Sequence, residues 1–139
     1  MILFLDTSEF RSVTCAIITS AKILQMKFKL KNNDSQQSFV YLKKFLSAHK
    51  KEWKKIEKII VVSGPGSFSG IRAGLANALA LGFAWNAEVL AIKKELVPAK
   101  ISDLLKFKKS HLKKVTQSFK PEYGAEPNIT MGVKDNENF

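Results

Sequence analysis

The sequence is poor in the residues that build disulfide frameworks and metal sites. Cys15 is the one cysteine, so an internal disulfide is excluded, as is typical of a reducing cytoplasm. The two histidines, His49 and His111, lie far apart and have no group of cysteines or carboxylates near them in sequence. We therefore expect no metal ion and no other cofactor. We interpret Cys15 as a small core residue and His49 as a packing or surface residue.

Long apolar runs are also absent. A bilayer-spanning helix needs about 20 predominantly apolar residues, and no run approaches that length. The opening residues, MILFLDTS, lack the basic region of a secretory signal peptide and are typical of a buried strand. These absences predict a cytoplasmic protein without membrane contact.

Arginine is scarce although the chain is strongly basic. The formal net charge is +11, and lysine supplies 21 of the 23 basic residues; Arg11 and Arg72 are the only arginines. Arginine forms paired, planar hydrogen bonds with phosphate, whereas lysine offers a point charge. The charge therefore fits either a solvated lysine surface or weak attraction to RNA, and composition leaves both open.

The 139 residues are 45% hydrophobic, which predicts a single folded domain. The first part of this domain is predicted to form three strands. Residues 2–5 are continuously apolar, as in a strand buried on both faces. Residues 12–19 are rich in β-branched side chains, and residues 22–31 alternate between apolar and polar positions. The short link between these two strands predicts an antiparallel hairpin.

Two helices and two further strands are predicted after the hairpin. Apolar residues at helical spacing indicate a helix over 36–49, and a buried strand follows at 59–62. A glycine-rich turn then leads into a helix over 70–85 and a short strand at 88–92. This order, β-β-β-α-β-α-β, predicts an α/β fold with a mixed five-stranded sheet and flanking helices.

The character of the chain changes after Lys93. The residues that follow are rich in lysine, and the apolar positions beyond Pro98 predict one or two short helices. The end of the chain, from Pro121, is acidic and has no periodicity, so it is expected to be extended or disordered. We divide the chain into an N-terminal lobe over 1–95, a lysine-rich helical remnant of a second lobe over 96–120, and a tail over 121–139.

The stretch VVSGPGSFSGIRAG, residues 61–74, places a glycine-rich turn between a strand and a helix. Such a turn can capture an anion, because backbone N–H groups and the helix dipole point at it. However, it lacks the lysine of a P-loop and misses the last glycine of the dinucleotide-binding pattern by one residue. Ser67 and Ser69 fit a nucleophile elbow poorly. The turn alone is weak support for a phosphate site.

The helix over 70–85 is apolar around its circumference, with Arg72 and Asn77 as its only polar side chains. Two interpretations stay open: a core helix covered by the 36–49 helix, or two helices that together present an apolar face to a protein partner. In the second, the glycines let this helix approach another helix closely, and the turn holds a protein and not a phosphate. The residues expected at this interface are Phe39, Leu42, Phe45, Leu46, Arg72, Ala73, Ala76, Asn77, Ala80 and Ala84.

Two stretches carry a resemblance to a known family. ILFLDTS, residues 2–8, and SGPGSFSGIRAG, residues 63–74, resemble the TsaB (YeaZ) family, whose proteins are needed for threonylcarbamoyladenosine modification of tRNA. The family's glycine motif is matched with Ser69 in place of threonine and Ile71 in place of leucine. The residues of the motif loop are Gly64, Pro65, Gly66, Ser67, Phe68, Ser69 and Gly70.

The resemblance implies an actin/Hsp70-like fold built on an RNase H-like lobe. It also implies a non-catalytic scaffold that pairs with the related enzyme TsaD in making N6-threonylcarbamoyladenosine (t6A) in tRNA. The expected partners are TsaD, as a heterodimer, and TsaE; a homodimer is expected when the chain is alone, and contact with tRNA is expected to be indirect or weak. Relatives carry a second lobe about as large as the first, whereas this sequence continues only briefly after the last predicted strand.

Asp6, Thr7 and Ser8 lie at the end of the first strand. In ATP-using members of this fold, residues at that position help to bind the magnesium nucleotide. The resemblance to TsaB favours instead a carboxylate that is satisfied by N–H groups of its own loop. The alternative function is a single-lobe nucleotide-binding module of the sugar-kinase/Hsp70 type, in which Asp6 and the 64–70 loop hold phosphate.

Overall fold

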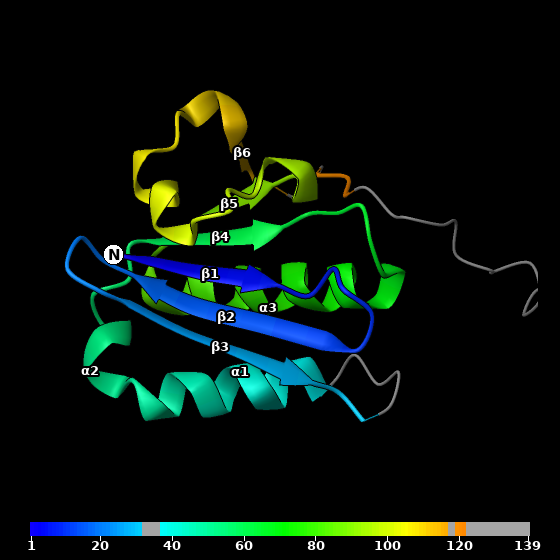
Figure 1. Cartoon of the computed structure of the whole chain (residues 1–139), viewed down its shortest axis with the longest axis horizontal. Coiled ribbons are helices and arrows are strands. Elements are labelled where there is room, and N and C mark those ends of the chain that lie inside the picture. The colour runs from blue at the N-terminus through cyan, green and yellow to red at the C-terminus, as the bar shows by residue number, and fades with distance from the viewer. Residues whose placement is uncertain (32–36, 117–118, 122–139) are drawn as a thin grey trace, which may run out of the picture.

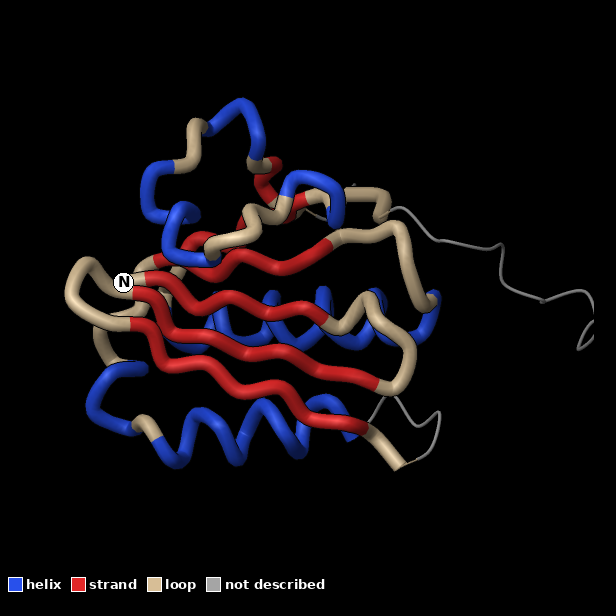
Figure 2. Tube along the Cα trace, in the orientation of Figure 1, coloured by secondary structure: helices blue, strands red, loops and turns tan. Residues whose placement is uncertain are grey.

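The computed structural model describes residues 1–31, 37–116 and 119–121, and six strands within them form one sheet (Figure 1, Figure 2). The strand order is β3-β2-β1-β4-β5-β6. The prediction of five strands was wrong by one, because the two-residue strand β6 has no alternation that a sequence pattern could reveal. The strands are β1 (Ile2–Asp6), β2 (Ser12–Ile18), β3 (Ile23–Lys29), β4 (Lys58–Val62), β5 (Glu88–Ile92) and β6 (Lys113–Lys114).

The sheet is mixed, as expected. β1 pairs antiparallel with β2 and parallel with β4; β4 pairs parallel with β5, and β5 antiparallel with β6. Leu3 of β1 lies opposite Ile17 of β2 on one side and Ile59 of β4 on the other. The predicted hairpin is confirmed, with β2 and β3 paired from Ser12 and Lys29 to Ile18 and Ile23. The predicted α/β class is therefore confirmed.

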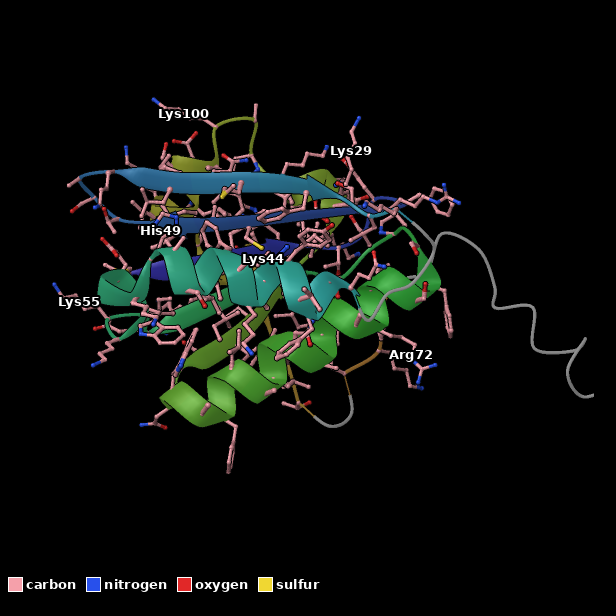
Figure 3. All side chains as sticks on the ribbon, turned by 90° about the horizontal axis from the view of Figure 1, so that it is seen from below. Lys29, Lys44, His49, Lys55, Arg72 and Lys100 are labelled. Atoms are coloured by element: carbon pink, nitrogen blue, oxygen red, sulfur yellow. The ribbon has the colours of Figure 1, made fainter. Side chains whose placement is uncertain are left out.

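Two helices, α1 (Gln37–Ala48) and α3 (Phe68–Trp85), lie side by side against one face of the sheet, and short α2 (Lys50–Trp53) follows α1 (Figure 3). Residues three or four positions apart share one side of a helix, so each helix buries one stripe against the strands. No helix in the described ranges is long and apolar enough to cross a bilayer. The buried helix residues in this core are Leu42, Phe45, Leu46, Ile71, Leu75 and Ala78.

The opposite face of the sheet is covered by the chain after β5, in short 3₁₀ turns. These are η1 (Lys94–Leu96), η2 (Ile101–Lys106) and η3 (Lys109–His111). The strands are apolar on this face too, so it needs a cover of its own; within the turns Leu104 is fully buried. The division at residues 95 and 96 stays a prediction, and the predicted tail lies outside the described residues from residue 122 onward.

Candidate functional site

The glycine-rich loop between β4 and α3 contacts the end of β1. Ser67 caps α3: its hydroxyl oxygen accepts a hydrogen bond from the Gly70 N–H (3.3 Å). The Ser67 N–H donates to the Ser8 carbonyl (2.9 Å), and the Thr7 hydroxyl donates to the Gly70 carbonyl (2.6 Å). The loop is therefore bonded on both of its sides to residues 7 and 8.

Two glycines make this close approach feasible. A Cβ atom at Gly66 would collide with the Ser8 carbonyl oxygen, and one at Gly70 would collide with the Thr7 carbonyl oxygen. We predicted that the glycines let the strand turn sharply into a helix that approaches another helix closely. At Gly66 and Gly70 the backbone that comes close is the chain's own turn after β1.

Asp6, at the end of β1, has both carboxylate oxygens engaged. Its Oδ1 accepts hydrogen bonds from the Ser8 N–H (2.9 Å) and the Ser8 hydroxyl (2.6 Å). Its Oδ2 lies 2.6 Å from the Lys94 ammonium. The expectation of a carboxylate satisfied by its own loop holds for Oδ1, whereas Oδ2 is paired with a lysine from outside that loop. Local sequence patterns missed Lys94, since it lies 88 residues away and is placed by its N–H bond to the Gly64 carbonyl (2.8 Å).

Glu9 extends this group of charges toward β3. Its carboxylate lies 2.8 Å from the Lys27 ammonium and 3.6 Å from that of Lys94. The hydrogen bond from Lys27 lowers the pKa of Glu9 below its ordinary value. Lys94 therefore bridges Asp6 and Glu9, and the position beside Asp6 already holds a cation supplied by this chain.

A cavity of about 120 Å³ lies beside the first turn of α3. Hydroxyl-bearing residues and Arg11 contribute to its wall. Ser12 is among them, and its buried hydroxyl oxygen has no hydrogen-bond partner in the described part of the chain. The lining residues with hydroxyl groups are Thr7, Ser12, Ser38, Ser67 and Ser69.

The residues expected at a protein interface fall into two groups. Leu42, Phe45 and Leu46 belong to the core beneath α1 and do not reach the surface, so their assignment to the interface was wrong. Phe39 is exposed on α1, and Arg72, Ala76, Ala80 and Ala84 are exposed on α3, whereas Ala73 and Asn77 are half-buried.

Three further large apolar residues that are exposed on α1 and α3 were missed by the sequence reasoning. Val40 of α1 and Leu79 and Phe83 of α3 are exposed, Phe83 to 93%. The spacing of positions 72, 76, 79, 80 and 83 would have shown the α3 stripe, but a helix apolar all round hides which stripe faces outward. We call Phe39, Val40, Ala76, Leu79, Ala80, Phe83 and Ala84 the outer helix surface.

Polar contacts join and flank the two helices. The Asn77 amide donates to the Ser38 hydroxyl (3.4 Å) and links α3 to α1. The Arg72 guanidinium lies over the Phe68 ring, 5.3 Å from its centroid, and projects away from the sheet at the first turn of α3 (Figure 3).

The remaining chemically reactive side chains are dispersed. Cys15 is buried in β2, and burial raises the pKa of its thiol to about 12, in agreement with a core role. The His49 ring packs edge-on against Phe45, with 4.9 Å between the ring centroids, and the His111 ring packs against Phe107 in the same way at 5.4 Å. Among the described residues, no three His, Cys, Asp or Glu side chains lie together as metal ligands would.

Comparison with known proteins gives a family and a fold. A family model described as TsaD, tRNA N6-adenosine threonylcarbamoyltransferase, matches residues 30–103, more than half of the chain. No curated protein sequence matches.

Solved structures also resemble the chain, and three of them illustrate the likeness. YeaZ from Pseudomonas aeruginosa has a TM-score of 0.61 at 17% identity over 84% of this chain and 64% of its own. An uncharacterized protein with similarity to peptidase YEAZ from Pseudomonas aeruginosa has a TM-score of 0.60 at 16% identity, over 84% of this chain and 63% of its own. RuvC from T. thermophilus, in complex with a Holliday junction substrate, has a TM-score of 0.50 at 11% identity, over 69% of this chain and 66% of its own.

The chain spans less than two thirds of the length of either YeaZ-type structure. Identities this low show the fold alone, and that fold agrees with the resemblance carried by the glycine motif. The family model covers α1, β4, α3 and β5 and therefore includes the whole motif loop. The chain belongs to the TsaD family and has the fold of YeaZ (TsaB).

Proposed function

We propose that this protein is a non-catalytic partner of a TsaD-type paralogue in the t6A modification of tRNA. The observation that carries the proposal is the outer helix surface. Phe83 is 93% exposed, and Phe39 and Val40 are each 50% exposed on the neighbouring helix. Large apolar side chains exposed on two neighbouring helices are typical of protein interfaces.

The composition of the surface suits a helical partner. Ala76, Ala80 and Ala84 follow one another at helical spacing between the larger side chains, so a partner backbone could come close to α3. Leu79 and Phe83 flank these alanines and would fill pockets on the partner. Arg72 at the start of α3 would supply a polar contact at the rim.

The non-catalytic part of the proposal rests on the end of β1. Asp6 is bonded to Ser8 and Lys94, so its carboxylate would have to give up the Lys94 contact before it could serve a magnesium nucleotide. Family membership supports a partner from the same modification system. TsaE as an additional partner, and a homodimer of the isolated chain, are further parts of this proposal.

The test is size-exclusion chromatography with light scattering, on the chain alone and mixed with the TsaD-family paralogue of the same genome. We expect a one-to-one complex with the paralogue. Phe83→Glu should weaken that complex by at least about tenfold, since it places a charge at the most exposed large apolar side chain of that surface. Ala76→Glu and Ala80→Glu should act in the same way.

Leu105→Glu is the matched control. Leu105 is another exposed leucine, 41% accessible, but it lies on η2, outside both helices of the outer helix surface. It should leave the complex unchanged. Equal weakening by Phe83→Glu and Leu105→Glu, or a chain that stays apart from the paralogue, would refute the pairing.

A single-lobe nucleotide-binding module is the second candidate, and the cavity beside α3 is the observation that favours it. A helix N-terminus lined with hydroxyl groups is suited to an anion. ATP should then protect the backbone around Thr7 and Ser67 from hydrogen exchange. Unchanged exchange at saturating ATP would remove this candidate.

A further inference from the structure

A second and larger concave site lies at the carboxyl ends of two parallel strands. The groove has a volume of about 430 Å³. Ser63, which directly follows β4, and Lys93, which directly follows β5, both contribute to its wall. Ligands of open α/β sheets bind outside the carboxyl ends of the strands, so this is a position where a ligand is expected.

The wall of the groove is basic. Lys93, Lys113 and Lys120 line it together with His111, and none of the described residues that line it is a carboxylate. Lys113 is held in place because β6 pairs with β5, where it lies opposite Ala91. Three ammonium groups around one cavity would repel one another less when an anion lies between them.

The positive charge continues beyond the groove. Residues 93–116 contain eight lysines against Glu95 and Asp103. Lys94 is paired with Asp6, but five other lysines of this segment are exposed and have no ion pair within the described ranges. These five lysines are Lys100, Lys106, Lys108, Lys109 and Lys114. Three of them, Lys108, Lys109 and Lys114, lie within two residues of a groove-lining residue in the sequence and are the lysines beside the groove. Charge spread over this many side chains exceeds what one small anion needs and suits a polyanion.

The groove also has apolar side chains. Leu96, Leu112 and the Phe119 ring contribute to its lining. Proteins that bind single-stranded nucleic acid without sequence preference combine basic grooves, which follow the backbone, with aromatic rings on which bases stack. Lysine contacts phosphate as a point charge, which fits binding that does not depend on sequence.

We propose that this groove and the lysines beside it bind a single strand of nucleic acid through its phosphodiester backbone. None of the described residues that line the groove belongs to α1 or α3, so the groove is distinct from the outer helix surface. The two sites are neighbours, because Lys114 shares a separate hollow with Leu79 and Phe83. The proposal does not depend on pairing with a TsaD-type protein and can be tested on the isolated full-length chain.

The test measures fluorescence anisotropy of labelled RNA and DNA oligonucleotides of about 12 nucleotides and the same sequence. The groove variant is Lys113→Glu with Lys120→Glu. The matched control is Lys54→Glu with Lys55→Glu, which changes the net charge equally but lies just before β4, at the amino end of that strand. Circular dichroism checks that both variants are folded.

We expect the groove variant to bind at least about tenfold more weakly and the control to change by less than about threefold. The slope of log affinity against log salt should become shallower by about 0.7 for each phosphate that the variant no longer neutralises. Equal binding of RNA and DNA would support backbone recognition, and a preference for RNA would support a strand that is also read at its 2′-hydroxyls. Equal weakening in both variants, no binding by the wild type, or equally tight binding of free ATP would overturn the proposal.

Discussion

The two faces of the sheet are covered in different ways. On one face, two regular helices bury Leu42, Phe45 and Ile71 and leave an outer surface that is apolar. On the other, short 3₁₀ turns bury Leu104 and leave an outer surface that is rich in lysine. Both covers are required, because the inner strands β1, β4 and β5 are apolar on both sides. The covering layers, and not the sheet, therefore give each side of the molecule its surface chemistry.

The largest effect should come from removing a core side chain on each face. Phe45→Ala empties a site with no solvent exposure under α1 and should cost about 3–5 kcal/mol of unfolding free energy. Leu104→Ala should cost less, about 2–3 kcal/mol, because fewer buried neighbours surround it and the turns can relax. Urea denaturation measures both. An equal cost for Leu104→Ala would mean that the two covers contribute equally, and a larger cost would reverse the expected order.

Gly70→Ala probes the helix side of the motif loop. The new Cβ would collide with the Thr7 carbonyl oxygen, so we expect a destabilisation of about 1–3 kcal/mol, although alanine favours helices more than glycine does. Thermal unfolding compares this variant with Ser69→Ala at the exposed neighbouring position, which should stay within about 0.5 kcal/mol of the wild type. A stabilised Gly70→Ala variant would mean that the loop does not need the close contact with Thr7.

Lys94→Met probes the ion pair with Asp6 at the end of β1. It leaves Asp6 Oδ2, in a side chain that is 11% exposed, without its cation and should cost about 1–2 kcal/mol, since water can reach part of the site. Lys100→Met is the control, because Lys100 is exposed and unpaired within the described residues. If chemical denaturation gives the same stability for both variants, the bond between Lys94 and Asp6 contributes nothing measurable.

The smallest effect concerns pH. The pKa of Glu9 is lowered in the folded chain, so its ion pairs stabilise the fold above the unfolded pKa, and this contribution is lost as pH falls through the lower folded value. Glu9 is 48% exposed, so the effect is small. Between about pH 7 and about pH 3, wild type should lose slightly more stability than Glu9→Gln. If stability falls by the same amount with pH in both proteins, the bond between Lys27 and Glu9 does not stabilise the fold.

Much of the fold could be predicted from local patterns. The continuous apolar run of β1 and the alternation in β3 indicated their strands, and small turn residues placed the hairpin. The strand β6 could not be predicted, because its pairing with β5 depends on where the preceding turns return the chain. The inward stripe of α3 was equally hidden, since nearly every position of that helix is apolar.

By itself, the sequence determined the α/β class, the order of the elements and the motif loop, because these follow from hydrophobic periodicity and glycine spacing within short stretches. Tertiary structure decided which loop and helix residues remain available for binding. The loop glycines accommodate Thr7 and Ser8, Lys94 pairs with an aspartate 88 residues away, and Phe83 faces outward. These outcomes depend on which distant surfaces meet when both faces of the sheet are covered, and local patterns carry no information about such contacts.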